Sequence, residues 1–524
     1  MIQIGILVDS INPDQWLLSM ASVIREFGYG VNFIIDTRPA PSVPWPLKHL
    51  KEIGLSNSEK LPKPSFNEKF EFVKLDQLKG VDFIIDPTGK GLINVEGISV
   101  AIEILYFNFY SAHQNWVGLS EWITKGASVG FQLLRFTPQS NHWEQTEKFH
   151  SRSNPKLFYK HQRETYSTCL TVLRHVLSSL QSPAASSSIK WMACSSQPID
   201  FGILRNNNSN LLTRSWFALG LFFKRACHQL LVKVFYVEDW VILLGQKSDF
   251  LKRGFAALKP IPNRPRYYNA DPFIFSHGDH LYLFYEEFSK VTNRGHLACF
   301  SYDRRSGSLK QQIVLEKPYH LSYPFVFKQD GLWYMIPESG ENGTVDLYQS
   351  TEFPFEWKYI RTLVKDIQAY DSTVFFVQGQ YWLFCTVRMV SESSPDTDLC
   401  IFYSDDLIHG EWIPHHGNPL KRNHWGSRPA GRIFLDGSAL IRPAQICLPI
   451  YGWGYVFNEI VKLDSDTFEE HMVKEFTPLA KGPIKAMHTY NADGEIVAID
   501  AKVRQSRISL RFKSFSDAFN QFKV

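Results

Sequence analysis

The feature that most constrains the fold is a repeat in the second half of the chain. Five segments share one plan: a short apolar strand, a turn carrying glycine or aspartate, and a second strand. They begin at Pro272, Pro324, Ser372, Gly431 and Met487, so their starts lie about 50 to 60 residues apart. This spacing is typical of propeller blades, each of which is a small antiparallel sheet. The repeat therefore predicts a five-bladed β-propeller.

The first half has a different pattern. Residues 2–8 form a continuous apolar run suited to a buried parallel strand, residues 16–27 have helical spacing, and residues 31–35 and 81–85 are further buried runs. Strands alternating with helices predict a doubly wound α/β sheet. The predicted organisation is an α/β domain at 1–180, a linker and apolar connecting segment at 181–245, and the propeller at 246–524.

Charge and cysteine usage exclude several function classes. The net charge of +4 over 524 residues, without a long basic tract, argues against a nucleic-acid partner. Seven scattered cysteines without a CxxC pair indicate reduced thiols, and the chain starts with a strand pattern where a signal peptide would be basic. Both observations predict a cytoplasmic protein.

One segment, residues 211–243, is unusually apolar, although no run reaches the length of about 20 residues that a membrane span needs. Peripheral membrane contact through an interfacial helix is one interpretation. A helix and a strand packed between the two domains is the other.

The first strands of all blades converge on the axis of a propeller, so residues at their starts share one site. Those positions are occupied by polar or ionisable side chains: Asp271, Tyr323, Asp371, Arg428 and His488. The ends of the second strands add Glu286, Glu287, Glu338, Arg388, Arg442 and Gln445.

Paired carboxylates at such a site suit glycosidic bonds, whose cleavage needs a protonated acid and an ionised base or nucleophile. We expect Asp271 to be the base or nucleophile, Glu338 the acid, and Asp371 a group that tunes the acid or orients the sugar. The predicted substrate-binding residues are Arg428, Arg442, Gln445, His488 and Tyr323. Alternatives stay open: Asp271 as a turn residue, Glu338 in a polar hairpin, and the arginines as buried ion-pair partners. No metal ligands or cofactor loop are predicted.

Six ordered motifs carry a family resemblance: Asn269-Ala-Asp-Pro272, Leu321-Ser-Tyr-Pro-Phe325, Met335-Ile-Pro-Glu-Ser339, Tyr370-Asp-Ser-Thr373, Ser427-Arg-Pro-Ala-Gly431 and Arg442-Pro-Ala-Gln445. Residues of about 235–520 resemble the N-terminal domain family of glucosamine inositol phosphorylceramide transferases. The domain is also similar to five-bladed furanosidase and glycosidase propellers, which carry Asp, Asp and Glu at blade starts one, three and four. Asp271 and Asp371 match the first two, whereas Arg428 stands where that Glu would be.

A second resemblance concerns the first 180 residues. The segment Asn108-Phe-Tyr-Ser-Ala-His-Gln-Asn-Trp-Val-Gly118 resembles the catalytic loop of formyltransferases that use formyl-tetrahydrofolate. Tyr110 stands where the catalytic His would be, and residues 139–145 lack the Asp-Thr-Gly motif. The resemblance therefore implies a degenerate domain that is inactive in formyl transfer and is kept for binding a nucleotide sugar or a partner.

Together these observations predict a carbohydrate-active enzyme, a glycosidase-like or glycosyl-transferring propeller in surface polysaccharide or glycolipid assembly. Its substrate would be a carbohydrate or a nucleotide sugar. The alternatives are a non-catalytic glycan-binding module and an amino-sugar formyltransferase-like protein.

Overall fold

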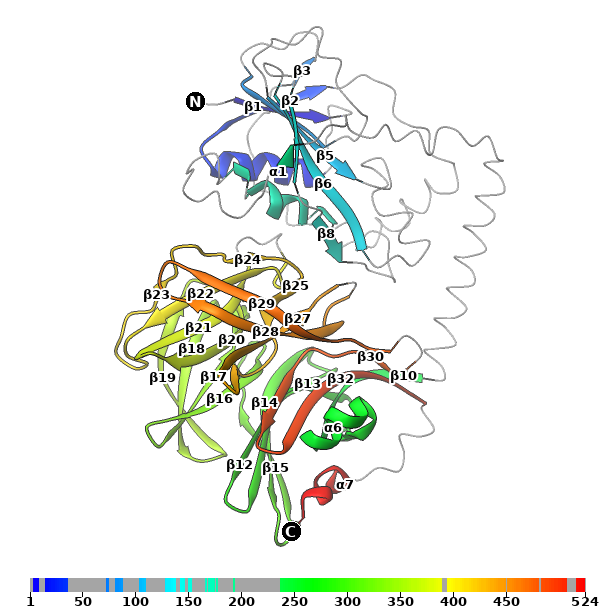
Figure 1. Cartoon of the computed structure of the whole chain (residues 1–524), viewed down its shortest axis with the longest axis vertical. Coiled ribbons are helices and arrows are strands. Elements are labelled where there is room, and N and C mark those ends of the chain that lie inside the picture. Colours follow the sequence, from blue (N-terminus) through cyan, green and yellow to red (C-terminus); the bar gives the residue numbers. More distant parts are fainter. Residues whose placement is uncertain are drawn as a thin grey trace, which may run out of the picture. The chain divides into compact units, whose positions relative to one another are not determined.

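The computed structural model divides the chain into two compact units, Met1–Cys227 and His228–Val524. Figure 1 shows the first unit in blue to teal and the second in green to red. In the second unit the structure describes residues 236–388, 394–448, 450–479, 482–506 and 515–523. In the first unit it describes residues 3–8, 15–35, 72–74, 81–87, 103–109, 128–137, 142–146, 149–152, 165–166, 168–174, 176–177 and 192–193.

The first unit contains a mixed sheet with the strand order β3-β2-β1-β4-β5-β6-β7-β9, and β8 pairs with β6. Strands β1 to β5 run parallel, and the order reverses at β1, which pairs with both β2 and β4. The predicted apolar runs 2–8, 31–35 and 81–85 thus become parallel strands, and the α/β prediction is confirmed at this level. The elements are β1 (Gln3–Val8), α1 (Gln15–Glu26), β2 (Gly30–Ile35), β3 (Phe72–Lys74), β4 (Phe83–Asp86), β5 (Glu103–Phe109), β6 (Ser128–Thr137), β7 (His142–Gln145), β8 (Phe149–Arg152) and β9 (Met192–Ala193).

The formyltransferase resemblance is not shown by this sheet. Asn108 lies in β5, but Tyr110 and the rest of the motif up to Gly118 lie outside the described residues, as do residues 181–191 of the predicted linker and connecting segment.

The second unit is the predicted propeller, and its first two blades are regular four-stranded antiparallel sheets. Blade one contains β12 (Tyr267–His277), β13 (His280–Ser289), β14 (Arg294–Asp303) and β15 (Leu309–Leu315). Blade two contains β16 (Ser322–Gln329), β17 (Leu332–Glu338), β18 (Thr344–Glu352) and β19 (Glu356–Lys365).

Blades three and four each add a short fifth strand that pairs inside the blade. Blade three contains β20 (Ala369–Val377), β21 (Gln380–Val387), β22 (Asp398–Ser404), β23 (Ile413–Pro414) and β24 (Lys421–Arg422). Blade four contains β25 (Trp425–Pro429), β26 (Phe434–Asp436), β27 (Ala439–Ile446), β28 (Gly454–Leu463) and β29 (Phe468–Phe476).

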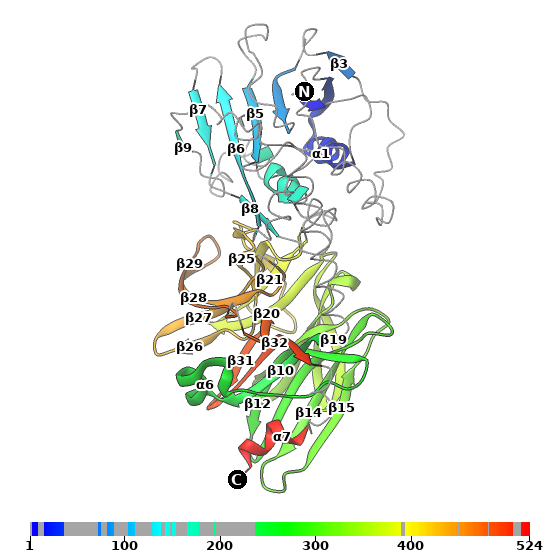
Figure 2. The same ribbon diagram turned by 90° about the vertical axis from the view of Figure 1, so that its right-hand side faces the viewer.

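Blade five is built from both ends of the second unit. Strand β10 (Tyr236–Gln246) pairs antiparallel with β32 (Ile496–Ser506) along its whole length, and both are visible side by side in Figures 1 and 2. The blade is completed by β11 (Lys259–Pro260), β30 (Ile484–Ala486) and β31 (Tyr490–Asp493). The ring is thus closed by hydrogen bonds between its first and last long strands.

The pairing of β10 decides between the two interpretations for part of the apolar segment 211–243. Residues 236–243 lie in β10, where Val241 and Leu243 are buried in the core of blade five, so they do not form an interfacial helix. Residues 211–235 lie outside the described residues. Among the helices that the structure describes, none is both long and apolar enough to cross a membrane.

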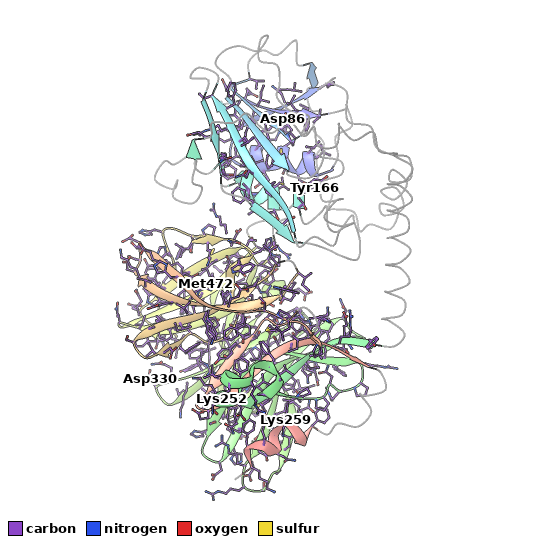
Figure 3. All side chains as sticks on the ribbon, turned by 45° about the vertical axis from the view of Figure 1, so that its right-hand side comes forward. Asp86, Tyr166, Lys252, Lys259, Asp330 and Met472 are labelled. Carbon is purple, nitrogen blue, oxygen red and sulfur yellow. The ribbon has the colours of Figure 1, made fainter. Side chains whose placement is uncertain are left out.

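Aromatic side chains on the first strands fill the space between blades. Phe273 of blade one meets Phe325 of blade two edge to face, with ring centroids 5.7 Å apart, and both are buried. The first strands are buried over most of their length, as expected for strands packed between neighbouring blades. Side chains fill the second unit in Figure 3, where Met472 marks exposed β29 and Asp330 marks the β16–β17 turn. Short helices α6 (Lys247–Arg253), η6 (Gly254–Ala257), η7 (Gly340–Asn342), α7 (Ser516–Phe519) and η9 (Asn520–Phe522) complete the description.

Candidate active site on the propeller axis

The first strands of blades one to three share an unusual backbone conformation near their starts. Asp271, Tyr323 and Asp371 have φ values of 51°, 45° and 55°, and each lies where the pairing register shifts. For residues other than glycine this left-handed conformation costs roughly 1–3 kcal/mol and persists only where the surroundings enforce it. The three repeats therefore form matching β-bulges, which turn these side chains away from the regular ladder.

Asp271 is a buried carboxylate held by its two neighbouring blades. Its Oδ2 accepts a hydrogen bond from the backbone N–H of Tyr323 (3.1 Å), and its Oδ1 accepts one from Thr489 Oγ1 (2.8 Å). Burial raises the pKa of Asp271, His488 opposes this, and the nearby Asp500 adds to it. The residue predicted to be the base is thus at the axis, with its proton affinity increased.

Asp371 is held by a fork of donors from blade four. Arg428 donates from Nε to Oδ2 (2.6 Å) and from Nη2 to Oδ1 (3.1 Å), and Gln445 Nε2 donates to Oδ2 (2.6 Å). Arg428 also donates to Asp396 Oδ1 (3.0 Å), so one guanidinium bridges two carboxyls. Burial raises the pKa of Asp371 to about 7, against the attraction of Arg428.

Two glutamates occupy the same register position in blades one and two. Glu286 pairs with Ala270 and Glu338 pairs with Ser322, the residues that precede the two bulges. Glu338 accepts hydrogen bonds from Ser322 Oγ (2.5 Å) and from the backbone N–H of Gly340 (3.0 Å).

These groups form what we call the carboxyl cluster: Asp271, Glu286, Glu338, Asp371 and Asp500. Its members are all buried, and the other four all act to raise the pKa of Glu286.

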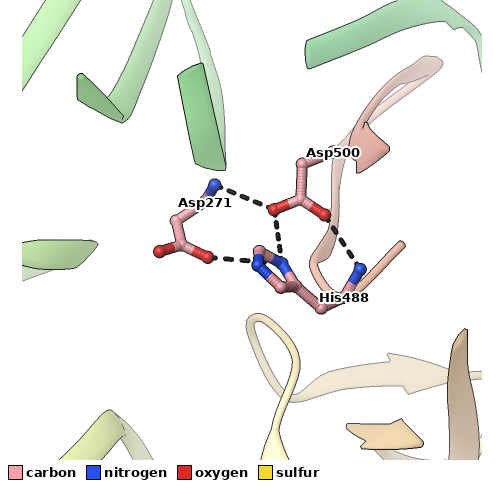
Figure 4. A group of neighbouring side chains, drawn as sticks. All are labelled: Asp271, His488 and Asp500. Carbon is pink, nitrogen blue, oxygen red and sulfur yellow. Dashed lines mark hydrogen bonds and ion pairs between the residues drawn. The ribbon is translucent and has the colours of Figure 1, made fainter. Parts of the chain in front are cut away.

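His488 and Asp500 join blade five to blade one, as Figure 4 shows. His488 Nδ1 lies 2.6 Å from Asp500 Oδ2 and 3.6 Å from Asp271 Oδ1. Asp500 Oδ1 accepts the backbone N–H groups of His488 and Thr489 (both 2.9 Å), and Oδ2 accepts that of Asp271 (2.9 Å). Burial lowers the pKa of His488, but Asp500 outweighs this and the pKa is raised.

The spacing of Asp271, His488 and Asp500 would allow one ligand atom from each to share a metal ion. However, both oxygens of Asp500 are already occupied by three backbone donors and the imidazole, which gives a closed hydrogen-bonded group. We therefore describe it as an ion-paired clamp between blades and assign no metal to it.

Aromatic side chains lie against His488 and Arg428 beside the cluster, and we call Trp240, Tyr370 and Tyr451 the aromatic collar. Trp240 stacks on His488 with centroids 4.1 Å apart, and Tyr451 meets His488 edge on at 5.3 Å. The Arg428 guanidinium lies 5.2 Å from the ring centre of Tyr370 and 5.3 Å from that of Tyr451. Tyr451 is 36% exposed, so part of the collar faces solvent.

The predicted binding residues divide into two groups. Arg428, Gln445 and His488 meet at the axis with Asp271, Asp371 and Glu338. Tyr323 is fully buried, and its hydroxyl accepts the N–H of Gly431 (2.7 Å) and contacts Thr373.

Arg442, like Tyr323, belongs to the second group, whose side chains are buried and hydrogen-bonded within the protein. It is 1% exposed and donates to both carboxyl oxygens of Glu470 (2.7 and 2.8 Å) and to the carbonyls of Gly426 and Ser427. Its contacts support blade four, which matches the ion-pair alternative left open from the sequence.

Four further residues of the site were not predicted from the sequence: Asp396, Asp500, Trp240 and Tyr451. Asp500 directly follows the apolar run Ile496–Ile499 of the fifth repeat, within one or two positions of where glutamates follow the second runs of the first two repeats, so a comparison of second-strand ends would have suggested it. Asp396 and Tyr451 lie in loops, and Trp240 belongs to a strand that precedes the first repeat copy, so no periodic signal marks them.

Comparison with known proteins assigns the domain. Residues 258–495 match the family model described as glucosamine inositolphosphorylceramide transferase 1, N-terminal. The propeller belongs to this domain family. The resemblance drawn from the six motifs is thereby confirmed.

Curated relatives match over part of their length. Glucosamine inositolphosphorylceramide transferase 1 of Arabidopsis thaliana is 35% identical over 209 residues, which cover 39% of this chain and 27% of that protein. The protein of the same name from Oryza sativa subsp. japonica is 34% identical over 209 residues, covering 39% and 28%. The matched region thus spans little more than a quarter of these relatives.

Solved structures with similar chain courses include glycoside hydrolases. Zg3597, a family 117 glycoside hydrolase from Zobellia galactanivorans, is 11% identical with a TM-score of 0.33, covering 51% of this chain and 90% of that one. The α-L-arabinofuranosidase PaAbf62A from Podospora anserina, in complex with cellotriose, is 12% identical with a TM-score of 0.34, covering 45% and 90%.

Proposed function

We propose that the propeller acts on a glycosidic linkage, transferring or hydrolysing a glycosyl group at the carboxyl cluster, in surface polysaccharide or glycolipid assembly. The observation that carries this proposal is the joint presence of the cluster and the aromatic collar. Five buried carboxyls face one arginine and one histidine, so they are not all ionised together. A protonated carboxyl beside an ionised one is what glycosidic cleavage requires.

The collar supports a sugar as the ligand, since the flat apolar face of an aromatic ring packs against the C–H face of a pyranose or furanose. The curated relatives are named as transferases, which favours transfer over hydrolysis. A nucleotide sugar as donor and a cytoplasmic location are parts of the proposal. The buried free thiols Cys385 and Cys400, which pair directly across two strands of blade three, support a reducing compartment.

Replacing Asp271 by asparagine tests the enzymatic proposal. Asparagine keeps the shape and an acceptor oxygen for Tyr323 or Thr489 but cannot take a proton, so we expect turnover to fall at least about 100-fold. Release of nitrophenol or nucleotide is measured over panels of p-nitrophenyl glycosides and nucleotide sugars, with exposed Asp330→Asn as the matched control. Equal rates in the variant and the wild type would contradict the role of Asp271.

A glycan-binding module is the second candidate, because Arg428 and Gln445 hold Asp371 in a fully hydrogen-bonded state. A propeller that binds glycans on an array but turns over no member of either panel would support this candidate.

Both candidates need the collar, and Tyr451 is its most exposed member. We expect Tyr451→Ala to weaken glycan binding about three- to tenfold, as for the loss of one aromatic contact. The measurement is titration against the best array hit, and Phe376→Ala, 45% exposed in blade three, is the control. Unchanged affinity would place the sugar elsewhere.

For the first unit, the proposal is unchanged from the sequence: a formyltransferase-like α/β domain that does not transfer formyl groups and binds a nucleotide sugar or a partner.

A further inference from the structure

The five members of the carboxyl cluster differ in their hydrogen bonds, and one of them stands apart. Asp271, Glu338, Asp371 and Asp500 each accept at least two hydrogen bonds. Among the residues that the structure describes, Glu286 accepts none, and its ion-pair contact is with His320 Nε2, 3.6 Å from Oε1. Ionised carboxylates are stabilised by donors, so the carboxyl without donors is the one suited to hold the proton.

The next residue, Glu287, shows that the lack of donors is specific to the face of β13 that points to the axis. Glu287 points to the other face of β13, where Arg264 and His296 (2.9 Å) bind it and keep its pKa lowered. On the face toward the axis, no donor among the described residues lies within hydrogen-bond distance of Glu286. Glu287 is therefore held in its ionised form, whereas a negative charge on Glu286 would have no donor to compensate it.

His320 does not compensate Glu286 either. The backbone N–H of Gly295 donates to His320 Nδ1 (2.9 Å), so Nδ1 is an acceptor and the ring proton lies on Nε2. That nitrogen is beyond hydrogen-bond distance from Glu286. Burial raises the pKa of Glu286 well above 4.5, and the nearby carboxyls of Asp271, Glu338, Asp500 and Asp371 add to this.

We propose that Glu286 is the proton donor of the axial site, a role the sequence argument gave to Glu338. This inference rests on the proposed function. Glu286 is next to the expected base, because it pairs with Ala270, which precedes Asp271. Its side chain is 8% exposed, which leaves an edge open to substrate and solvent. Glu338, fixed by Ser322 and Gly340, positions the cluster.

The reaction then balances as follows. Glu286 gives its proton to the glycosidic oxygen, the bond between that oxygen and the anomeric carbon breaks, and the bonding electron pair leaves with the oxygen. Asp271 takes a proton from water or an acceptor hydroxyl, whose oxygen bonds to the anomeric carbon. The proton returns from Asp271 to Glu286 through solvent.

Glu286→Gln tests the donor role through its dependence on the leaving group. We expect the turnover rate of this variant to fall at least about 100-fold on alkyl glycosides, whose leaving oxygen needs protonation. On p-nitrophenyl glycosides the rate should fall less than about tenfold. The wild-type rate should fall as pH rises through the raised pKa of Glu286, and the variant should lack this alkaline limb. Glu338→Gln and exposed Glu316→Gln are the comparison variants. Equal losses on both substrate classes, or the leaving-group pattern in Glu338→Gln instead, would overturn the inference.

Infrared difference spectroscopy separates this inference from the proposed function. Folded wild-type protein at neutral pH should show the C=O stretch of a protonated carboxyl that disappears in Glu286→Gln. A missing band overturns the donor role even if the enzyme is active. A band in a propeller that turns over no glycoside or nucleotide sugar defeats the enzymatic proposal and the donor role with it.

Discussion

Replacing Asp500 by asparagine is expected to lower the free energy of unfolding by about 3–5 kcal/mol, as for other buried ion pairs that lose one partner. Asparagine would bring an NH₂ group against a backbone donor or the His488 imidazole, both of which now point at carboxylate oxygens. The measurement is urea denaturation. The control is Asp466→Asn, because Asp466 pairs with His416 at 2.8 Å while both are 70% exposed. A loss under about 1 kcal/mol, the range of exposed pairs, would contradict the clamp.

This stabilisation has a defined pH window. The pKa of Asp500 is lowered, since His488 and backbone donors outweigh burial, so its contribution is present above the unfolded value of 3.8 and is lost as pH falls. The pKa of His488 is raised, so its contribution is present below 6.5 and is lost as pH rises through the raised value. The difference in unfolding free energy between the wild type and Asp500→Asn should therefore be largest between these two pH limits.

Replacing Arg442 by methionine is the second large effect, also about 3–5 kcal/mol. The change leaves the buried Glu470 carboxylate with Lys421 and Asn458 alone, and it removes donors from the carbonyls of Gly426 and Ser427. The readout is again urea denaturation, at pH 7.

Arg442 also lowers the pKa of Glu470 against the effect of burial, so the loss in Arg442→Met should shrink as acid protonates Glu470. The double variant Arg442→Met with Glu470→Gln should recover part of the stability, because no uncompensated charge remains. Arg305→Met, 77% exposed and paired with Asp279, is the control and should change stability by under about 1 kcal/mol. If Arg305→Met lowers the free energy of unfolding as much as Arg442→Met does, loss of the buried Arg442–Glu470 pair is not the cause of the destabilisation.

The propeller was predictable because the strand–turn–strand plan recurs at a regular spacing. Three of the predicted starts, Pro272, Pro324 and Ser372, lie in β12, β16 and β20, whereas Gly431 lies between β25 and β26 and Met487 between β30 and β31. What the repeat did not reveal is the partner of the last blade: β10 lies outside every repeat copy, and pairing over more than two hundred residues leaves no local pattern. The propeller boundary therefore lies earlier than the predicted residue 246.

The site was partly predictable for a similar reason. Asp271, Asp371, Arg428 and His488 could be placed at the axis because equivalent positions converge. Which carboxyl is ionised could not be predicted, since that depends on donors such as Gly340 N and Thr489 Oγ1 brought together only by folding.

The way blade five is assembled has a consequence for how the protein matures. Asp271 belongs to the first blade, whereas His488 and Asp500 belong to the last, which β10 must complete. The emerging polypeptide carries β10 and the first four blades before β32 is made, and the clamp forms only once His488 and Asp500 reach Asp271. Under the proposed function, a nascent or clipped propeller that lacks this last segment is therefore expected to be inactive.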